Sequence, residues 1–250
     1  MGYVIAIAGK GGTGKTTVAA LIVRILKEKK LGSILAIDAD PNSNLAEALG
    51  QPVKHTIGQI LNDISAHPEK VPSGMPKDRF IEYQVQAAIE EGEGFDTLTM
   101  GRPEGPGCYC YVNNALRGVM DKLIKDYDYV IIDNEAGLEH LSRRTTRSAD
   151  TLLVVSDATT VGLRAAKRIR DLVKELNIKT SKNLLLINRC DVQPEQDKVG
   201  IPGLNYLGDM PTDAQIQKIS LNGQSLWQLK DDAVSISALR KSGDSIWQRN

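Results

Sequence analysis

The stretch that decides the fold is Gly9-Lys10-Gly11-Gly12-Thr13-Gly14-Lys15-Thr16-Thr17, near the start of the chain. It fits the pattern G-x-x-x-x-G-K-[ST] from Gly9 to Thr16. An apolar run from Tyr3 to Ala8 precedes it, and apolar residues at helical spacing follow from Thr17 to Glu28. A buried strand, a glycine-rich loop and a helix in this order predict a phosphate-binding loop.

The glycines of this loop allow consecutive backbone N–H groups to turn inward around phosphate oxygens, at a helix N-terminus that favours anions. Lys15 is expected to reach the β- and γ-phosphates, and the Thr16 hydroxyl to bind Mg²⁺. A purely structural glycine turn would not need Lys-Thr at its end. The predicted nucleotide contacts are Gly9, Lys10, Gly11, Gly12, Thr13, Gly14, Lys15, Thr16 and Thr17.

Composition excludes several classes of protein. The 250 residues suffice for one α/β domain with a buried core, and no apolar run approaches the ~20 residues of a membrane span. Basic and acidic residues balance at 31 each, which gives no general attraction to nucleic acid or membrane. An aromatic content of 4% argues against stacking of single-stranded nucleic acid. With three cysteines and no signal peptide, we expect a soluble cytoplasmic protein without nucleic-acid or membrane partners.

Apolar runs alternate with amphipathic helical stretches along the chain. This alternation predicts an α/β fold with a mostly parallel sheet covered by helices on both faces. The expected strands are Tyr3–Ala8, Ser33–Ile37, Thr97–Met100, Tyr129–Ile132, Thr151–Val155, Leu184–Ile187 and Leu204–Leu207. The clearest helix is Leu163 to Leu176, with a basic outer face. Residues 51–94 are interpreted as a helical and loop insertion, with Thr56 as a helix N-cap, within a single domain over 1–250.

Carboxylates follow two of the expected strands. Asp38 and Asp40 lie at the end of the second run, where alternation places both on one side of the sheet edge at which nucleotides bind. Turn formation before Pro41 is the alternative role for this pair. Asp133 ends the run Val130-Ile131-Ile132, which is the Walker B form that holds Mg²⁺ through water.

A second informative feature is Gly105-Pro106-Gly107-Cys108-Tyr109-Cys110. In an extended segment the two thiols point the same way, with Cα atoms ~6.6 Å apart, and can bind one metal ion at ~2.3 Å per bond. A helix is expected to begin near Asn113 or Asn114, so that its positive end favours thiolates. In a face-to-face dimer, a second pair would complete four sulfur ligands on the two-fold axis. Two thiols without a ligand remain the alternative.

The form K-G-G-x-G-K-T-T, with Lys10 early in the loop, resembles the deviant Walker A ATPases. That family includes the nitrogenase iron protein, the Min and Par ATPases and several metallochaperones. The resemblance implies an ATP-dependent homodimer in which Lys10 reaches the nucleotide of the other subunit. It further implies that Asp40 activates the attacking water, that Asp38 supports the Mg²⁺ shell, and that Gly137 begins a segment sensing the γ-phosphate.

The same resemblance implies a base-binding end. Asn188 would read the base, with Arg189 beside it and with Pro211 and Asp213 on a second base-side loop. An asparagine amide offers both a donor and an acceptor, which suits adenine. The guanine-selective form Asn-Lys-x-Asp is incomplete because Arg189 replaces its lysine, although Asp191 stands at the right spacing. ATP is therefore the expected nucleotide, and GTP the alternative.

Four segments together resemble the CooC-type ATPases (CooC and AcsF) that mature carbon monoxide dehydrogenase and acetyl-CoA synthase. They are K-G-G-T-G-K-T-T, I-D-A-D-P-N, G-C-Y-C-Y-V-N-N-A-L and D-N-E-A-G-L-E-H, and the resemblance covers nearly the whole chain. It implies a nickel chaperone: ATP drives homodimerisation, Cys108 and Cys110 hold Ni²⁺ for delivery to one of those enzymes, and hydrolysis to ADP and phosphate resets the dimer. Ligand chemistry alone does not favour Ni²⁺ over Zn²⁺.

Two other functions stay open. A Min- or Par-type spatial organiser needs no Cys-x-Cys, and the tail from Ser235 to Asn250 lacks the amphipathic membrane helix of Min proteins. An iron–sulfur electron donor of the nitrogenase type uses cysteines from two loops, and the segment from Asp133 to His140 has none. The pair Cys108 and Cys110 would still suffice for a cluster bridging two subunits.

Overall fold

The structure is a computed structural model that describes residues 2–102, 110–135, 148–192 and 194–248. The strands among these residues are β1 (Tyr3–Gly9), β2 (Ile34–Asp38), β3 (Glu90–Gly92), β4 (Phe95–Thr99), β5 (Tyr129–Asp133), β6 (Ser148–Ser156), β7 (Lys179–Asn188) and β8 (Asn205–Met210). They form one sheet in the order β3-β4-β2-β5-β1-β6-β7-β8. All neighbours run parallel except β3 and β4, which pair antiparallel at one edge.

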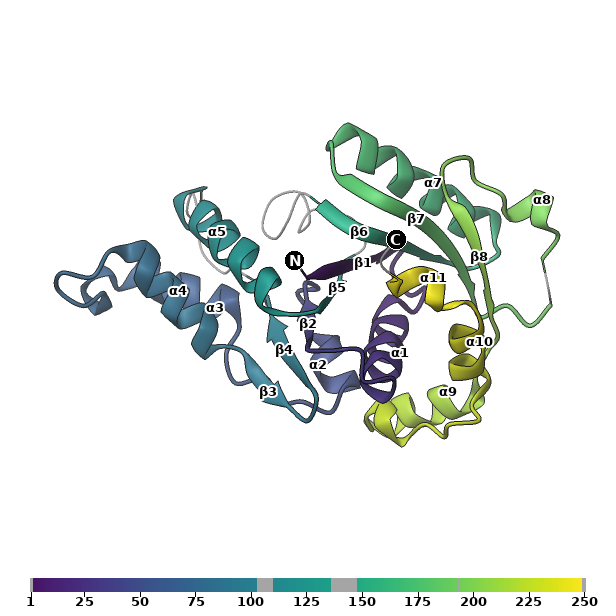
Figure 1. The fold of residues 1–250 in the computed structure, drawn as a ribbon, viewed down its shortest axis with the longest axis horizontal. Coiled ribbons are helices and arrows are strands. Elements are labelled where there is room, and N and C mark those ends of the chain that lie inside the picture. Colours follow the sequence, from purple (N-terminus) through teal and green to yellow (C-terminus); the bar gives the residue numbers. More distant parts are fainter. Residues whose placement is uncertain (1, 103–109, 136–147, 193, 249–250) are drawn as a thin grey trace.

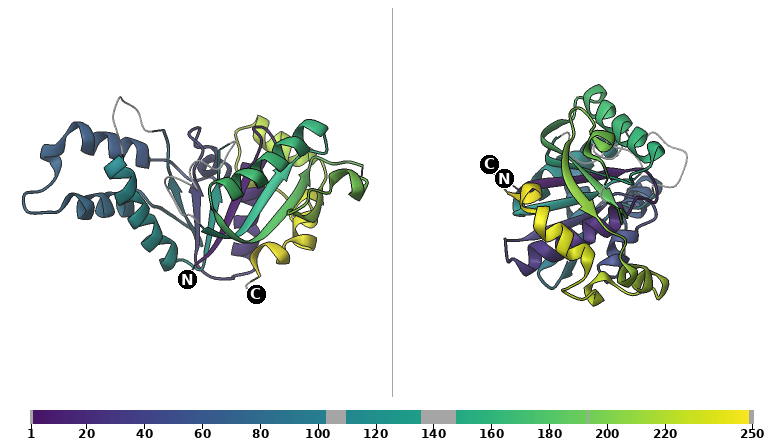
Figure 2. Two further views of the ribbon diagram at one scale, coloured as in Figure 1. Left: turned by 90° about the horizontal axis from the view of Figure 1, so that it is seen from above. Right: turned by 90° about the vertical axis from the view of Figure 1, so that its right-hand side faces the viewer.

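Helices cover both faces of this sheet. The described α-helices are α1 (Lys15–Glu28), α2 (Asn44–Ala48), α3 (Ile57–Ala66), α4 (Lys77–Ala87), α5 (Cys110–Asp126), α7 (Thr160–Glu175), α8 (Gln196–Val199), α9 (Ala214–Leu221), α10 (Val234–Ser242) and α11 (Asp244–Trp247), with 3-10 turns η1 (Pro68–Lys70) and η2 (Leu226–Gln228). Figures 1 and 2 show α1 and α10 on one side of the sheet, α5 and α7 on the other, and α3 and α4 extending beyond the β4 edge. No described helix combines the length and apolarity that crossing a bilayer requires.

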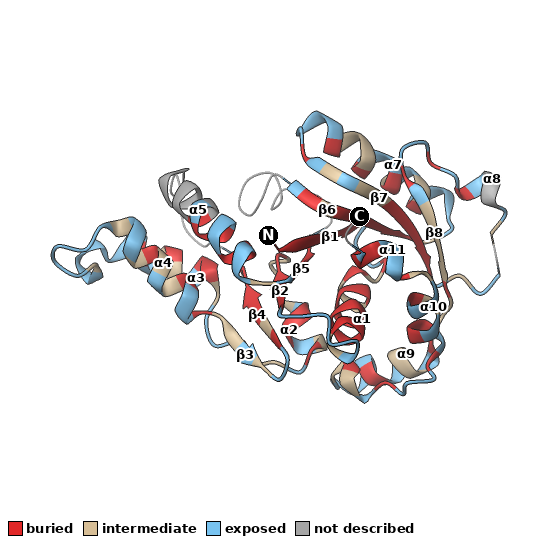
Figure 3. Cartoon of the chain, viewed as in Figure 1, coloured by how far each residue is buried: buried red, intermediate tan, exposed pale blue. Residues whose placement is uncertain are grey.

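The hydrophobic core consists of two layers, one on each side of the sheet. Along β1, Ile5 and Ile7 pack in the layer that contains α1 and α10, whereas Val4 and Ala6 pack in the layer that contains α5 and α7. Figure 3 shows the central strands buried along their length. A strand covered on both faces must be apolar at every position, which explains the continuous apolar runs in the sequence.

The structure confirms the predicted fold class, and each expected strand corresponds to an observed one within a few residues. Thr56 is a helix N-cap as predicted, in a capping box with Gln59. The short strand β3 was not expected, because its sequence Glu-Glu-Gly has no apolar residue. The prediction that a helix begins near Asn113 or Asn114 was wrong, since α5 already starts at Cys110.

The C-terminal segment is attached to α1 by a buried arginine. Arg24 is only 6% exposed. Its guanidinium donates to the carbonyl oxygens of Leu226 (3.1 Å) and Leu229 (2.6 Å), and to the carboxylates of Glu28 (2.7 Å) and Asp231 (2.6 Å). Because one planar cation serves four acceptors, its loss would leave buried carbonyls without donors.

We predict that Arg24→Met lowers the free energy of unfolding by roughly 3 kcal/mol, because the carbonyl oxygens of Leu226 and Leu229 lose their donor and stay buried. The matched control is Arg240→Met, since Arg240 binds the same Glu28 from an exposed position. The control should cost less than about 1 kcal/mol. Urea unfolding followed by circular dichroism measures both, and equal losses would contradict the assignment.

Candidate nucleotide-binding site

The predicted site residues lie at one edge of the sheet. In the parallel register, Ile7 of β1 and Asp38 of β2 both pair with Asp133 of β5. The glycine-rich loop that follows β1 therefore begins beside the carboxylates that end β2 and β5. This is the carboxyl edge of a parallel sheet, where open α/β folds bind ligands.

The glycine-rich loop turns around one of its own carbonyl groups. The carbonyl oxygen of Lys10 accepts hydrogen bonds from the Thr13 backbone N–H (3.3 Å), the Thr13 hydroxyl (2.9 Å) and the Lys15 ammonium (3.4 Å). These are donors of the kind that cradle phosphate oxygens. The Lys15 side chain is buried within the site, whereas Lys10 is exposed.

Gly14 is required by geometry. Its φ is +90°, in the left-handed region, and a Cβ at this position would lie 2.3 Å from the Asn188 Nδ2 atom. Gly9 is constrained by space instead, since a Cβ there would lie 2.3 Å from the Val155 carbonyl oxygen. Two of the glycines that the motif specifies therefore allow close approach of neighbouring strands to the loop.

Asp133 is joined to the start of α1. Its Oδ2 atom accepts a 2.6 Å hydrogen bond from the Thr16 hydroxyl, while its Oδ1 atom is buried and has no hydrogen-bond partner among the residues that the structure describes. Burial raises the pKa of Asp133 to about 7, although the Thr16 hydroxyl lowers it. Mg²⁺ prefers oxygen ligands. The Thr16 hydroxyl and the Asp133 carboxylate supply such oxygens side by side, so these two residues fit that ion.

Asp38 and Asp40 have different surroundings. Asp38 is 1% exposed, and its two oxygens accept the backbone N–H groups of Asp40 (3.1 Å) and Leu45 (2.7 Å). Burial raises the pKa of Asp38 to about 6. Asp40 is half-buried, and its Oδ1 atom accepts from both nitrogens of Asn42 at 2.9 Å. Asp38 thus holds the backbone of the turn after β2, whereas the Asp40 side chain is more exposed than that of Asp38.

A cavity of about 440 Å³ adjoins the loop where a base would lie. Asn188, Arg189, Pro211 and Asp213 all line it, as do Thr17 and the middle and last residues of α9. The Asn188 amide, however, donates to the Thr13 carbonyl (2.7 Å) and accepts from the Arg189 N–H (2.8 Å). Both ends of this amide are engaged within the protein, so base reading by Asn188 stays a prediction.

The Asp213 carboxylate is also used by the protein itself. It accepts from the N–H of Gln215 (2.9 Å) and from the hydroxyl (2.7 Å) and N–H (3.2 Å) of Ser235. Burial raises the pKa of this carboxyl, but those hydrogen bonds outweigh burial and leave it below the ordinary value. Asp191 likewise binds the Thr212 N–H (2.9 Å) and hydroxyl (3.0 Å), which is not the free carboxylate that a guanine reader would need.

Several predicted metal and sensor positions are not described. Cys108 and Gly137 lie outside the described residues, and of Cys110 only the backbone is described, as the first residue of α5. Among residues 2–102, 110–135, 148–192 and 194–248, no group of three or more His, Cys, Asp or Glu residues could hold a metal ion. The paired-thiol site therefore stays a prediction.

Sequence reasoning missed three groups at this edge. The Leu45 N–H that binds Asp38 and the Lys10 carbonyl that accepts from the loop donors are backbone groups, which carry no residue-type signal. Thr212, which binds Asp191, is 21 residues from it in the chain, so no local pattern links the two. Pairing of the ends of β7 and β8 is the signal that would have linked Thr212 to Asp191.

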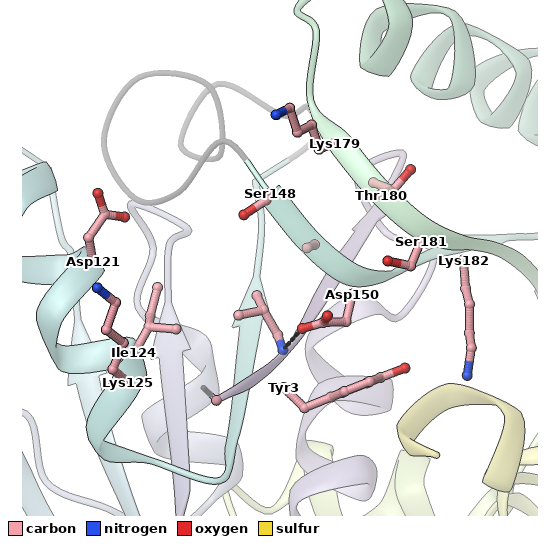
Figure 4. Close-up of a pocket in the computed structure, with 13 residues that line it drawn as sticks. Tyr3, Asp121, Ile124, Lys125, Ser148, Asp150, Lys179, Thr180, Ser181 and Lys182 are labelled. Carbon is pink, nitrogen blue, oxygen red and sulfur yellow. Dashed lines mark hydrogen bonds between the residues drawn. The ribbon is translucent and has the colours of Figure 1, made fainter. Parts of the chain in front are cut away.

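A larger hollow of about 740 Å³ lies at the opposite ends of the strands. It is lined by the beginnings of β1, β6 and β7 and by the last turns of α5, and contains none of the predicted site residues. Figure 4 shows Lys179, Lys125 and Asp121 around it, with the Asp150 carboxylate bound to the Val4 N–H at its floor (2.7 Å). The predicted nucleotide-site residues that the structure describes therefore lie away from this hollow, at the carboxyl edge of the sheet.

Comparison with known proteins shows which families this chain is similar to. The model of the AAA domain family AAA_31 matches residues 2–186. An uncharacterised ATP-binding protein of Methanocaldococcus jannaschii is 43% identical over 236 residues, covering 92% of each chain. The carbon monoxide dehydrogenase accessory protein CooC of Rhodospirillum rubrum is 29% identical, covering 90% of this chain and 89% of that protein, with alignment over 238 residues.

A solved structure shares the fold. The septum site-determining protein MinD of Pyrococcus horikoshii, complexed with Mg-ADP, matches with a TM-score of 0.71 over 98% of this chain and 96% of that one. Its sequence identity is 23%, so the likeness speaks for the architecture alone.

We predict that Gly14→Ala weakens ATP binding at least about tenfold, because a Cβ in the left-handed region is strained and this one meets the Asn188 amide. Gly118→Ala is the control, since an added Cβ in α5 meets nothing within 4 Å. Isothermal titration with ATP and Mg²⁺ tests the pair. If Gly14→Ala binds ATP as tightly as the wild-type protein, the loop does not contact the nucleotide in the conformation described above.

We further predict a pH dependence of stability without nucleotide. The pKa of Asp133, about 7, lies above its ordinary 3.8, so the folded protein keeps a proton that the unfolded chain releases. Stability therefore falls as pH rises from about 4 to 7. Asp133→Asn should raise the unfolding free energy at pH 8 by roughly 1 to 3 kcal/mol.

Urea unfolding at pH 5.0 and 8.0 measures this effect, where the two pH values lie on either side of the Asp133 pKa of about 7. The control is Asp63→Asn, an exposed carboxyl whose pKa is lowered by the Lys70 ammonium. It should not gain stability at alkaline pH. A wild-type pH profile identical to that of Asp133→Asn would refute the assignment.

Proposed function

The chain belongs to the AAA_31 family of AAA domains and is a P-loop ATPase, and we propose that it is an ATP-dependent nickel chaperone. Its client would be carbon monoxide dehydrogenase or acetyl-CoA synthase. The observation that carries this proposal is the sequence pair Cys108 and Cys110, of which Cys110 is the first residue of α5, in a chain of which 90% aligns with CooC. A Min- or Par-type spatial organiser needs no Cys-x-Cys segment, whereas an iron–sulfur electron donor could use the same two thiols.

The nucleotide would be held by the residues at the carboxyl edge of the sheet. Lys15 is buried with its ammonium directed to the inside of the loop, at the Lys10 carbonyl, where the β- and γ-phosphates would bind. Thr16 and Asp133 would hold Mg²⁺, which neutralises charge on the phosphates when it is bound. Asp38 would act indirectly, by fixing the turn that carries Asp40.

Asp40 would act on the attacking water. One of its oxygens is bound by Asn42, which fixes the carboxylate in place. The other oxygen has no hydrogen bond within the described part of the chain and so can accept a proton from water. Transfer of that proton to Asp40 would leave hydroxide to attack the γ-phosphorus, with ADP as the leaving group.

Lys10 would connect hydrolysis to dimerisation. Its side chain is exposed although its carbonyl belongs to the loop interior, so its ammonium is accessible to a second copy of the chain. A cation supplied across an interface stabilises the dimer only while the triphosphate is present, and stabilises transition-state charge. Closing the dimer would bring two Cys108/Cys110 pairs together, and four thiolates complete a tetrahedral site for the cargo ion.

We predict about one Ni²⁺ per dimer in the presence of ATP, because each chain supplies two of four thiolates. Cys108→Ala and Cys110→Ala should each abolish stoichiometric binding. The matched control is Cys190→Ala, because the Cys190 thiol is half-buried and donates to the Val192 carbonyl (3.1 Å). Anaerobic light scattering and metal analysis, with no nucleotide, ADP or ATP, provide both readouts.

Other outcomes would identify the alternatives. ATP-dependent dimers that bind Ni²⁺ equally with and without Cys108 would exclude the chaperone and favour a spatial organiser. Iron with acid-labile sulfide, in a brown protein, would favour the electron donor. Zn²⁺ that Ni²⁺ cannot displace would leave a structural dimer site in place of a nickel cargo site.

Lys10→Ala should lose ATP-dependent dimerisation while it keeps ATP binding.

A further inference from the structure

Two consecutive side chains at the end of β7 bind two consecutive carbonyl groups of the glycine-rich loop. The Asn188 Nδ2 atom donates to the Thr13 carbonyl oxygen at 2.7 Å. The Arg189 Nη1 atom donates to the Gly12 carbonyl oxygen at 3.1 Å. The contacts join segments that are 175 and 177 residues apart in sequence, so they are tertiary features of the site.

The backbone at Arg189 is specialised for this contact. Its φ is +55°, in the left-handed region that costs a residue with a Cβ about 1 kcal/mol or more. The Asn188 side chain accepts from the Arg189 N–H (2.8 Å), and the Cys190 N–H donates to the Met210 carbonyl (3.1 Å). Such a conformation persists only where its surroundings determine it. Here it ends the straight course of β7 and leaves the guanidinium at Gly12.

The geometry of the peptide group explains what these contacts do. In a trans peptide the carbonyl oxygen and the following N–H point in opposite directions. A donor on the Gly12 carbonyl therefore fixes the Thr13 N–H, which points to the loop interior and binds the Lys10 carbonyl (3.3 Å). A donor on the Thr13 carbonyl fixes the Gly14 N–H in the same way. When side chains outside the loop hold these carbonyl groups, the N–H groups that follow them point to the inside of the loop, where an anion binds.

We propose that Arg189 is a positioning residue, which holds the glycine-rich loop in its phosphate-binding form before nucleotide arrives. The proposal rests on the proposed nucleotide role of that loop. It assigns Arg189 to the phosphate end of the site, although the residue also lines the cavity for the base. A preformed loop loses less conformational freedom on binding, so the benefit extends to any ligand with a phosphate chain, whatever its base.

The test compares Arg189→Ala with Arg189→Lys and with Arg164→Ala, an exposed arginine of α7 far along the chain from the loop. Each is titrated with ATP, ADP, GTP and inorganic tripolyphosphate in the presence of Mg²⁺. Arg189→Ala should weaken all four by a similar factor, roughly three- to tenfold. KM for ATP should rise by that factor with kcat unchanged. Arg189→Lys should recover part of the loss, since an ammonium can donate to the same carbonyl.

Each other outcome is decisive. If Arg189→Ala weakens ATP but leaves tripolyphosphate unchanged, Arg189 reads the base and the proposal fails. If the melting temperature falls along with affinity and Arg189→Lys repairs neither, the residue is merely structural and the proposal fails. If Arg189→Ala binds ATP as tightly as the wild-type protein does, only the positioning role is overturned. If the wild-type protein binds none of the four phosphate ligands, the proposed nucleotide site is overturned as well.

Discussion

The hydrogen bond from the Thr16 hydroxyl to the Asp133 carboxylate, 2.6 Å long, is the contact on which the site depends. It joins the first turn of α1 to the end of β5, and the register between β1 and β5 determines that these two groups meet. Since β2 pairs with the other side of β5, the same register brings Asp38 to this edge. One strand in the middle of the sheet thus aligns the loop, the predicted Mg²⁺ ligands and the turn that carries Asp40.

Much of this arrangement follows from local sequence. A strand covered on both faces must be apolar throughout, so the strands β1, β5 and β6 were readable as apolar runs. The strand β3 was not readable, because Glu90-Glu91-Gly92 is held by antiparallel pairing at the edge of the sheet and not by burial. The glycine-rich loop was predictable because its chemistry resides in consecutive residues, whose spacing alone identifies a phosphate cradle.

The functions of individual site residues were less predictable, because they depend on contacts between distant segments. Residue type suggested that the Asn188 amide would read a base, yet the structure engages it with the Thr13 carbonyl and the Arg189 N–H. Asp213 is similar: its carboxylate joins the start of α9 to Ser235 of α10. A side chain with hydrogen-bonding capacity takes whichever partner the fold brings closest, and sequence spacing does not specify that partner.

The buried carboxyls of the site are costly to the fold. Asp133 and Asp38 have raised pKa values, about 7 and 6, and one Asp133 oxygen has no hydrogen-bond donor among the described residues. Arg189 adds a left-handed backbone. Each feature lowers the stability of the fold, and a cation beside Asp133 would remove the first cost by favouring its ionised form. Ligand binding and folding are therefore linked, and the ligated form gains stability by mass action. The contact that joins α1 to β5 would thus link cation binding to the stability of the fold, because Asp133 takes part in both.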